Sequence, residues 1–392
     1  MKRILINSVF AKKGGALTYI QNVVAGLRKV LPADFEIIVL RTKTEDAAKY
    51  EVEGVKYINN DELSVQGAQA VSNPLKRLLF DQITLPKIIR KEKIDVLFSA
   101  GNFGVLRCPC KQILLVRNTV FFDDLYINRV QSSKVKWFYR LQKLLTIRSM
   151  KASDIVLFPS QAMYSLVAPQ VRMSKKNWQV SHYGSRPDLF FPSNEKKESG
   201  VVKFFHSGFY SDQKNLSVLL EAAKILDEKY HLKFKLEITA GFNQDWLGQS
   251  VFFPNFTKER QLYFQLKEKG LAEDLDWMSY ADLAMKYRTC DIFIFPSYTE
   301  SFGHPLIEAM HSALPVLASD TEVNRELCGD AGMYFSTFDA KDCAEKMYRL
   351  SQDEQLQKIM AQQGITRAAE FTWEKHAEVL KNCIDELCKN QK

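Results

Sequence analysis

Residues 295–317 read FPSYTESFGHPLIEAMHSALPVL. Its pattern predicts a buried strand that ends at Ser297 and a helix that Pro305 opens. The loop between them includes Glu300, Ser301, Phe302 and Gly303. A strand, a short glycine-containing loop and a helix form the repeating unit of parallel α/β sheets.

The same unit recurs along the chain. Short apolar runs lie at 3–9, 36–40, 94–99, 112–116 and 154–160, and again at 202–208, 233–241, 274–278, 291–297 and 314–319. Helical patterns such as 16–30 and 215–229 separate them, which indicates parallel sheets covered on both faces. The proline-, glycine- and serine-containing segment 183–200 interrupts the series. We therefore predict two doubly wound α/β domains, 1–185 and 186–372, followed by an amphipathic helix at 373–392.

Composition narrows the class of protein. The chain has 392 residues, 46% hydrophobic and 26% charged, which suits a folded protein too long for one core. Its seven cysteines form no CxxC pair, so we expect free thiols in a reducing compartment. No apolar run approaches the roughly 18–20 residues that cross a bilayer, and the first apolar run is too short for a signal peptide. We expect a cytoplasmic protein.

Charge is distributed unevenly between the halves. Residues 1–190 hold 30 Lys and Arg against 15 Asp and Glu, whereas the remainder carries a net negative charge within the overall +8. A basic half is attracted to an anionic surface. No nucleic-acid motif is present, so we expect peripheral contact with an anionic membrane and no nucleic acid.

Residues 130–151 concentrate this positive charge. Six cations alternate there with apolar residues: Lys134, Lys136, Arg140, Lys143, Arg148 and Lys151. One interpretation is a basic amphipathic helix at a membrane surface. An ordinary surface helix with a solvated charged face is an equal alternative.

The loop and helix at 300–308 suit an anionic ligand. Backbone N–H groups at a helix start bind phosphate, and Gly303 allows a close approach of the backbone. Glu308 lies about one turn into the helix, where its carboxylate can accept hydrogen bonds from vicinal hydroxyls such as those of ribose. The alternative is a helix start at which both glutamates only complement the helix dipole.

Two further segments add candidates. Lys214 follows the strand and glycine at 202–208 and precedes a helix, which places a cation where phosphate charge can be neutralised. Gly14 and Gly15 follow the first strand, for close approach to a ligand or for a tight turn. No His and carboxylate cluster has ligand spacing, so we expect no metal and no cofactor.

Together these strings closely resemble glycosyltransferase family 4. The likeness rests on Glu300 to Glu308 with the following PVLASDTEVNREL, on HSGFYSDQKN at 206–215, on FTWEKH at 371–376 and on the N-terminal glycine pair. The resemblance implies a GT-B fold, two Rossmann-like domains facing across a cleft, with the C-terminal helix packed back on the first domain. It also implies a retaining, metal-independent hexosyltransferase that moves a sugar from a nucleotide diphosphate donor to a hydroxyl acceptor.

The resemblance assigns roles residue by residue. Glu300 would contact the donor sugar at the reacting centre, and Lys214 would bind the diphosphate. Glu308 would hold the ribose. Further donor contacts would come from Gly15, Ser301, Phe302, Gly303, Leu306 and, at the base, Tyr280. The acceptor would be a glycan or lipid-linked saccharide in polysaccharide or lipopolysaccharide synthesis, with Gly14, Arg117 and Asn118 near the acceptor or a phosphate.

Two positions depart from the family pattern. Phe209 stands where the family has arginine, with Arg260, Arg325 or a basic residue of the first domain such as Arg117 as substitutes for the lost cation. Arg117-Asn118 stands where the family often has His-Asp. These departures keep two alternatives open, a sugar-nucleotide epimerase or phosphorylase on the same architecture and a non-catalytic binding protein that kept the fold.

Overall fold

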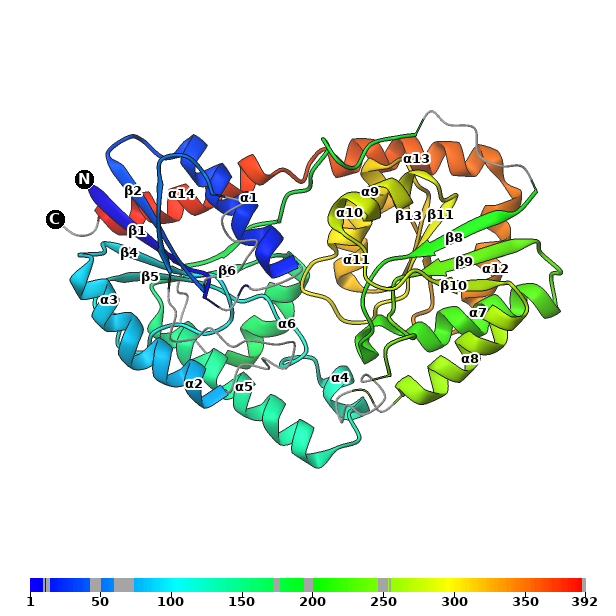
Figure 1. Ribbon diagram of the computed structural model, residues 1–392, viewed down its shortest axis with the longest axis horizontal. Helices are drawn as coiled ribbons and strands as arrows, with labels where there is room; N and C mark the ends of the chain where they lie inside the picture. Colours follow the sequence, from blue (N-terminus) through cyan, green and yellow to red (C-terminus); the bar gives the residue numbers. More distant parts are fainter. Residues whose placement is uncertain are drawn as a thin grey trace. The chain divides into compact units, whose positions relative to one another are not determined.

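The computed structural model describes residues 1–9, 11, 15–42, 51–59, 74–171, 177–193, 200–245, 253 and 255–389. The chain forms two compact units, shown in Figure 1. The first unit combines Met1–Phe122, Arg140–Gly184 and Thr372–Lys392. The second combines Asp123–Tyr139 and Ser185–Phe371.

The first unit is built on a parallel sheet in the order β3-β2-β1-β4-β5-β6-β7. Its strands are β1 (Lys2–Asn7), β2 (Phe35–Arg41), β3 (Val55–Asn59), β4 (Val96–Ser99), β5 (Lys111–Leu115), β6 (Ile155–Phe158) and β7 (Asn177–Val180). β4 and β6 are fully buried apolar runs, because helices cover both faces of the sheet.

The helices of this unit divide between the two faces. They are α1 (Gly15–Val30), α2 (Pro74–Leu79), the π-helical turn η3 (Phe80–Thr84), α3 (Leu85–Lys91), α5 (Ser133–Ala152), α6 (Gln161–Val171) and α14 (Trp373–Lys389). Phe80, Leu85 and Ile89 pack with Leu5 and Leu97 on one face of the sheet. α14 contacts α1 and β4.

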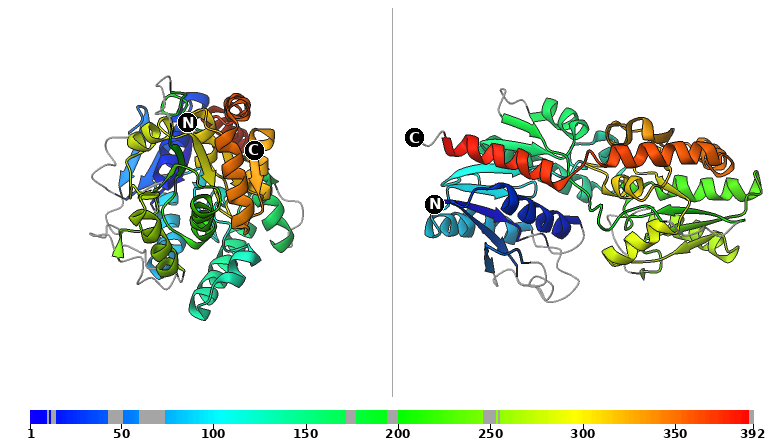
Figure 2. Two further views of the ribbon diagram at one scale, coloured as in Figure 1. Left: turned by 90° about the vertical axis from the view of Figure 1, so that its right-hand side faces the viewer. Right: turned by 90° about the horizontal axis from the view of Figure 1, so that it is seen from above.

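The last helix lies side by side with the first, as Figures 1 and 2 both show. A Cβ at Gly26 would lie 2.9 Å from Ala377 Cβ, and one at Gly184 only 2.1 Å from the Trp373 nitrogen. These two positions admit only glycine, because α1 and the chain at 184 approach the start of α14 so closely.

The second unit repeats the design with the parallel order β10-β9-β8-β11-β12-β13. Its strands are β8 (Val202–His206), β9 (Phe234–Ile238), β10 (Ala272–Asp274), β11 (Ile292–Phe295), β12 (Val316–Ser319) and β13 (Gly332–Phe335). The order turns back between β8 and β11, and such a switch point is where open α/β sheets bind ligands.

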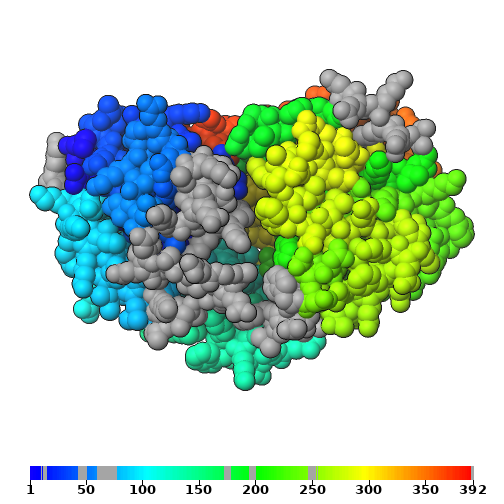
Figure 3. Space-filling view, in the orientation of Figure 1, coloured from blue at the N-terminus to red at the C-terminus, as the bar shows by residue number. Residues whose placement is uncertain are grey.

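Helices also cover both faces of this sheet. They are α4 (Asp124–Arg129), η4 (Asp212–Lys214), α7 (Leu216–Glu228), α8 (Phe256–Glu268), α9 (Tyr280–Arg288), α10 (His304–His311), α11 (Glu322–Cys328), η6 (Gly329–Ala331), α12 (Ala340–Gln352) and α13 (Glu354–Ala368). α7, α8 and α12 share one apolar core with the sheet. On the other face, the Tyr287 ring of α9 packs on Phe205 and Phe293. Green-to-yellow residues of this unit form the right-hand surface in Figure 3.

The structure differs from the sequence predictions in the bounds of two segments. The strand predicted at 274–278 lies earlier, as β10, because the chain turns at Asp276 (φ 59°) and leaves Trp277 77% exposed. Asp123–Tyr139, predicted within the first domain, groups with the second unit instead. The reason is packing, since Arg129 lies 3.7 Å from the Phe338 ring centroid and Tyr126 packs on Tyr298.

Candidate active site

Lys214 and Glu300 meet beyond the carboxyl ends of β8 and β11. Lys214 Nζ lies 2.7 Å from Glu300 Oε1, and the two side chains are only 15% and 13% exposed. Lys214 ends the short helical turn after β8, and Glu300 lies in the loop after β11. The structure therefore brings together the two residues that the sequence singled out for the reacting centre and the diphosphate.

Asn215 ties these loops together. It adopts a left-handed conformation (φ 54°), and its Nδ2 donates to the carbonyl oxygens of Pro296 (3.1 Å) and Thr337 (2.7 Å). The Tyr298 N–H adds a bond to the Gln213 carbonyl at 3.0 Å. Sequence reasoning assigned Asn215 no role, although asparagine is enriched among the non-glycine residues that adopt positive φ.

The α10 N-terminus follows Glu300. Gly303 precedes the helix, and the Leu306 N–H donates to the Gly303 carbonyl at 2.9 Å. Phe302 is 5% exposed, with its ring 5.2 Å from that of His304, and Ser301 is half-buried. The first turn presents backbone N–H groups and the positive end of the helix dipole.

The glycine at 303 also has a reason in the packing of the protein itself. A Cβ there would lie 2.8 Å from Leu306 Cδ1 and 3.3 Å from Leu327 Cδ1. Leu306 is fully buried, so its side chain belongs to the core. Gly303 therefore makes room for the protein's own apolar packing at the base of the loop.

Glu308 is buried against two tyrosines. Its Oε1 accepts a hydrogen bond from Tyr280 OH at 2.8 Å and its Oε2 one from Tyr287 OH at 3.3 Å. Burial raises the pKa of Glu308 to about 7, although the two tyrosine hydrogen bonds oppose the rise. A carboxylate has about four acceptor positions, so two bonds leave capacity for ribose hydroxyls. Tyr280, which was expected near the base, is one of the two donors to this carboxylate.

The remaining predicted residues lie in the first unit. Gly15 opens α1, and Gly14 lies outside the described residues. The backbone N–H groups of Arg117 and Asn118 donate to Asn102 Oδ1 at 2.8 and 3.1 Å. The Arg117 guanidinium lies 5.4 Å from the Tyr19 ring centroid. This loop follows β5, at the carboxyl edge of its own sheet.

The cations considered as substitutes for the family arginine have other partners. Arg260 Nη2 pairs with Asp245 at 2.7 Å, and Arg325 forms two bonds to Asp320 at 2.5 and 2.8 Å. The Phe209 ring lies against Gly241, where a Cβ would come within 2.6 Å of it. Lys214 is the cation that the structure brings to Glu300.

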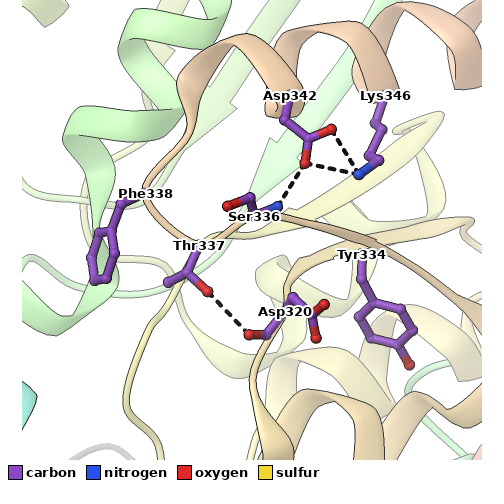
Figure 4. A pocket seen from close by; sticks show the side chains of 7 residues that line it. All are labelled: Asp320, Tyr334, Ser336, Thr337, Phe338, Asp342 and Lys346. Carbon is purple, nitrogen blue, oxygen red and sulfur yellow. Dashed lines mark hydrogen bonds and ion pairs between the residues drawn. The ribbon is translucent and has the colours of Figure 1, made fainter.

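A shallow hollow of about 580 Å³ lies at the ends of β12 and β13 (Figure 4). Its lining residues are Asp320, Tyr334, Ser336, Thr337, Phe338, Asp342 and Lys346. Lys346 is paired with Asp342 at 2.7 Å, and Asp320 with Arg325. The hollow lies beyond β12 and β13, whereas the Lys214–Glu300 contact lies beyond β8 and β11.

The described part of the chain also bears on membrane spanning, metal binding and the state of the cysteines. None of its helices has the length and apolar character needed to span a bilayer. Within the same residues, His, Cys, Asp and Glu form no group of three arranged for a metal ion. All seven cysteines are free thiols.

The sequence of the chain is similar to those of known proteins. Residues 186–367 match the family described as glycosyl transferases group 1. O-antigen chain mannosyltransferase B of Escherichia coli is 28% identical over 238 residues, which are 59% of this chain and 57% of that protein. The alignment thus spans little more than half of that relative.

Solved structures are similar over the whole chain. Sucrose-phosphate synthase of Thermosynechococcus elongatus has a TM-score of 0.77 at 16% identity and covers 100% of both chains. Alr3699/HepE of Anabaena, solved in complex with UDP, has a TM-score of 0.72 at 15% identity, over 98% of this chain and 100% of that one. These likenesses confirm the expected GT-B fold of two parallel-sheet α/β domains.

Proposed function

We propose that the protein is a retaining glycosyltransferase of the family 4 type, which moves a sugar from a nucleotide diphosphate to a hydroxyl acceptor. The observation that carries the proposal is the contact between Lys214 and Glu300 beside the start of α10. An ammonium and a helix N-terminus suit a diphosphate, and a carboxylate suits the hydroxyls of a sugar. The match of 186–367 to group 1 glycosyl transferases supports the same function.

The leaving diphosphate needs positive charge as the bond to the sugar breaks. Lys214 and the backbone N–H groups of α10 supply it, so the proposal requires no divalent metal and no cofactor. Ser301, Phe302, Gly303 and Leu306 line the start of α10, where backbone groups contact sugar and phosphate. Glu308 holds the ribose through the acceptor positions that Tyr280 and Tyr287 leave open.

The acceptor belongs to the first unit in this proposal. Arg117 and Asn118 lie in the loop after β5. Carboxyl ends of parallel strands are where open sheets bind ligands. The similar Escherichia coli protein is named for O-antigen chain synthesis, which supports a surface polysaccharide or lipid-linked glycan as the product.

A membrane-bound acceptor is consistent with α5. This helix contains six cations and no carboxylate, and Trp137 and Leu144 on it are 65% and 44% exposed. Trp137, Leu144 and the exposed Lys134, Arg140, Arg148 and Lys151 recur at helical spacing along one stripe. Teal residues of this region reach the surface at the lower edge of Figure 3. We infer peripheral contact with the anionic inner face of a membrane, at the cytoplasmic side.

The test is a binding and transfer screen. UDP-, GDP-, ADP- and dTDP-sugars are titrated calorimetrically, and the donor that binds is incubated with undecaprenyl-diphosphate-linked saccharides. NMR of the product then shows whether the anomeric configuration of the donor is retained. We expect one donor to bind and react in the wild type, and binding without transfer in Glu300→Gln. Absence of binding to all four donors would refute the function, and an inverted product would refute retention.

A further inference from the structure

His206 is a buried histidine at the carboxyl end of β8 that the proposed roles do not use. It is 0% exposed, and its Nδ1 lies 3.1 Å from the Ile294 carbonyl oxygen. A carbonyl only accepts hydrogen bonds, so Nδ1 carries the ring proton. Nε2 therefore presents a lone pair.

That lone pair has no hydrogen-bond partner. Nε2 is buried, and no donor among the described residues bonds to it. Burial, together with the nearby charge of Lys214, lowers the pKa of His206 to about 3, so the ring is neutral at physiological pH. A buried acceptor without a donor is unfavourable, which points to a state of the site in which a donor arrives.

Lys214 borders the same space as Nε2. A Cβ placed on Gly208 would lie 3.5 Å from His206 Nε2 and 3.5 Å from Lys214 Nζ. Gly208 has a φ of 153° and carries no Cβ, so the space between the two nitrogens stays open. Both groups also lie near the Phe295 ring, at 6.4 Å for the imidazole and 5.4 Å for the ammonium.

We propose that His206 is a positioning residue for Lys214, whose ammonium donates to His206 Nε2 when a nucleotide diphosphate is bound. The proposal rests on the proposed function, in which Glu300 turns to the sugar and Lys214 to the diphosphate. Lys214 then loses the carboxylate that it contacts in the structure. One of its three N–H groups then donates a hydrogen bond to the imidazole, and the others face the phosphate oxygens.

A neutral acceptor has an advantage over a carboxylate here. Glu300 cancels the charge of Lys214 while the two are paired, whereas a neutral imidazole directs the ammonium and leaves its charge for the diphosphate. Aliphatic residues at 206 would leave that N–H group without a partner. The chemistry thus accounts for a histidine that is buried, uncharged and fixed in one tautomer.

The test compares two variants of His206. His206→Phe keeps an aromatic ring without the lone pair, and His206→Gln restores an acceptor. UDP, GDP, ADP and dTDP are titrated together with their monophosphates. We expect His206→Phe to weaken binding of the nucleoside diphosphate fivefold to tenfold and binding of its monophosphate less than twofold. The affinity of His206→Gln for the diphosphate should lie between those of His206→Phe and the wild type. In a Lys214→Met background the effect of His206→Phe falls below twofold, because the histidine acts through the lysine.

Controls separate this role from a structural one. His376→Phe removes another buried neutral histidine, whose ring is bonded to Tyr19 and Ser181, and leaves the ratio of diphosphate to monophosphate affinity unchanged. Equal losses for both nucleotides in His206→Phe, or no loss, would overturn the proposal. Wild-type protein that binds none of the nucleotides would instead refute the proposed function itself.

A measurement on the wild-type protein tests the proposal even if the variants fail to fold. In protein labelled with ¹⁵N-histidine, the Nε2 resonance of His206 moves upfield when the nucleotide diphosphate is added, as expected when a lone pair accepts a hydrogen bond. The monophosphate leaves it unchanged. An Nε2 chemical shift that does not change when the diphosphate binds would also overturn the proposal.

Discussion

Lys214 Nζ lies 2.7 Å from Glu300 Oε1 although the residues are 86 positions apart in the chain. The contact exists because β8 and β11 are neighbours in the parallel sheet, so the loops after their carboxyl ends meet. In the protein without donor the two charges neutralise each other. A donor diphosphate must therefore compete with Glu300 for the ammonium.

Lys214→Met should weaken binding of the nucleotide diphosphate about tenfold to a hundredfold, since a hydrogen bond to a charged group contributes roughly 1.5–3 kcal/mol. The monophosphate should lose much less. Isothermal titration measures both. Lys358→Met, at an exposed position of α13, is the matched control and should bind like the wild type. Equal affinity of Lys214→Met and wild type would place the diphosphate elsewhere.

Glu300→Gln should have the opposite effect on binding. Removing the carboxylate charge frees the ammonium, so the nucleotide diphosphate should bind at least as tightly as in the wild type. Transfer of the sugar should fall at least a hundredfold, because the carboxylate next to the reacting centre is lost. Steady-state kinetics and calorimetry on one preparation separate the two effects. Weaker diphosphate binding would contradict the competition between Glu300 and donor.

Asn215 provides a test of loop anchoring. Asn215→Gly keeps the left-handed conformation and loses two buried hydrogen bonds, which should cost about 2 kcal/mol of unfolding free energy. Asn215→Ala should cost about 1 kcal/mol more, because alanine disfavours a φ of 54°. Urea unfolding of the two variants measures the difference. An alanine variant as stable as the glycine variant would argue against the strained turn.

The raised pKa of Glu308 predicts how the unfolding free energy depends on pH. A carboxyl whose folded pKa is about 7 and whose unfolded value is 4.5 holds a proton that the unfolded chain has lost. Its contribution to the unfolding free energy therefore falls as pH rises from about 4.5 to 7. Glu308→Gln mimics the protonated form, so its stability relative to the wild type should grow by up to about 3 kcal/mol between pH 5 and 8. Melting curves at both pH values test this, and a constant difference would contradict it.

The stripe on α5 predicts binding to anionic lipid. Wild-type protein should co-sediment with phosphatidylglycerol vesicles at low salt and should release in high salt, with a blue shift in emission that Trp137→Phe removes. The double variant Lys134→Glu/Arg140→Glu should bind at least tenfold more weakly. Lys358→Glu changes charge elsewhere and should bind normally. Equal binding to phosphatidylcholine vesicles would exclude an electrostatic contribution to membrane binding.

The order of strands and helices was predictable wherever apolar runs were long. Residues 36–40 and 314–319 are buried on both faces, and their composition alone indicates that. β3, β7 and β13 were missed. They lie at the edges of their sheets, where half-exposed residues replace the continuous apolar run.

The sequence singled out Lys214 and Glu300 as candidates but not the residues that support them. Lys214 and Glu300 follow strands in a recognisable pattern, whereas the bonds of Asn215 join 215 to 296 and 337, which only the sheet order brings together. The tyrosines on Glu308 come from α9, whose register against α10 depends on side-chain packing. Sequence spacing carries no information about such contacts.

The close fit of Trp373 on Gly184 has a consequence for synthesis of the chain. The buried face of α14 includes Trp373, Ala377, Leu380, Ile384 and Leu387, so the first unit completes its core only with α14. A ribosome delivers α14 only after residues 185–371 of the second unit. The N-terminal half must therefore wait, with an open apolar face, while the later half can fold, and premature termination after residue 371 should yield an insoluble product.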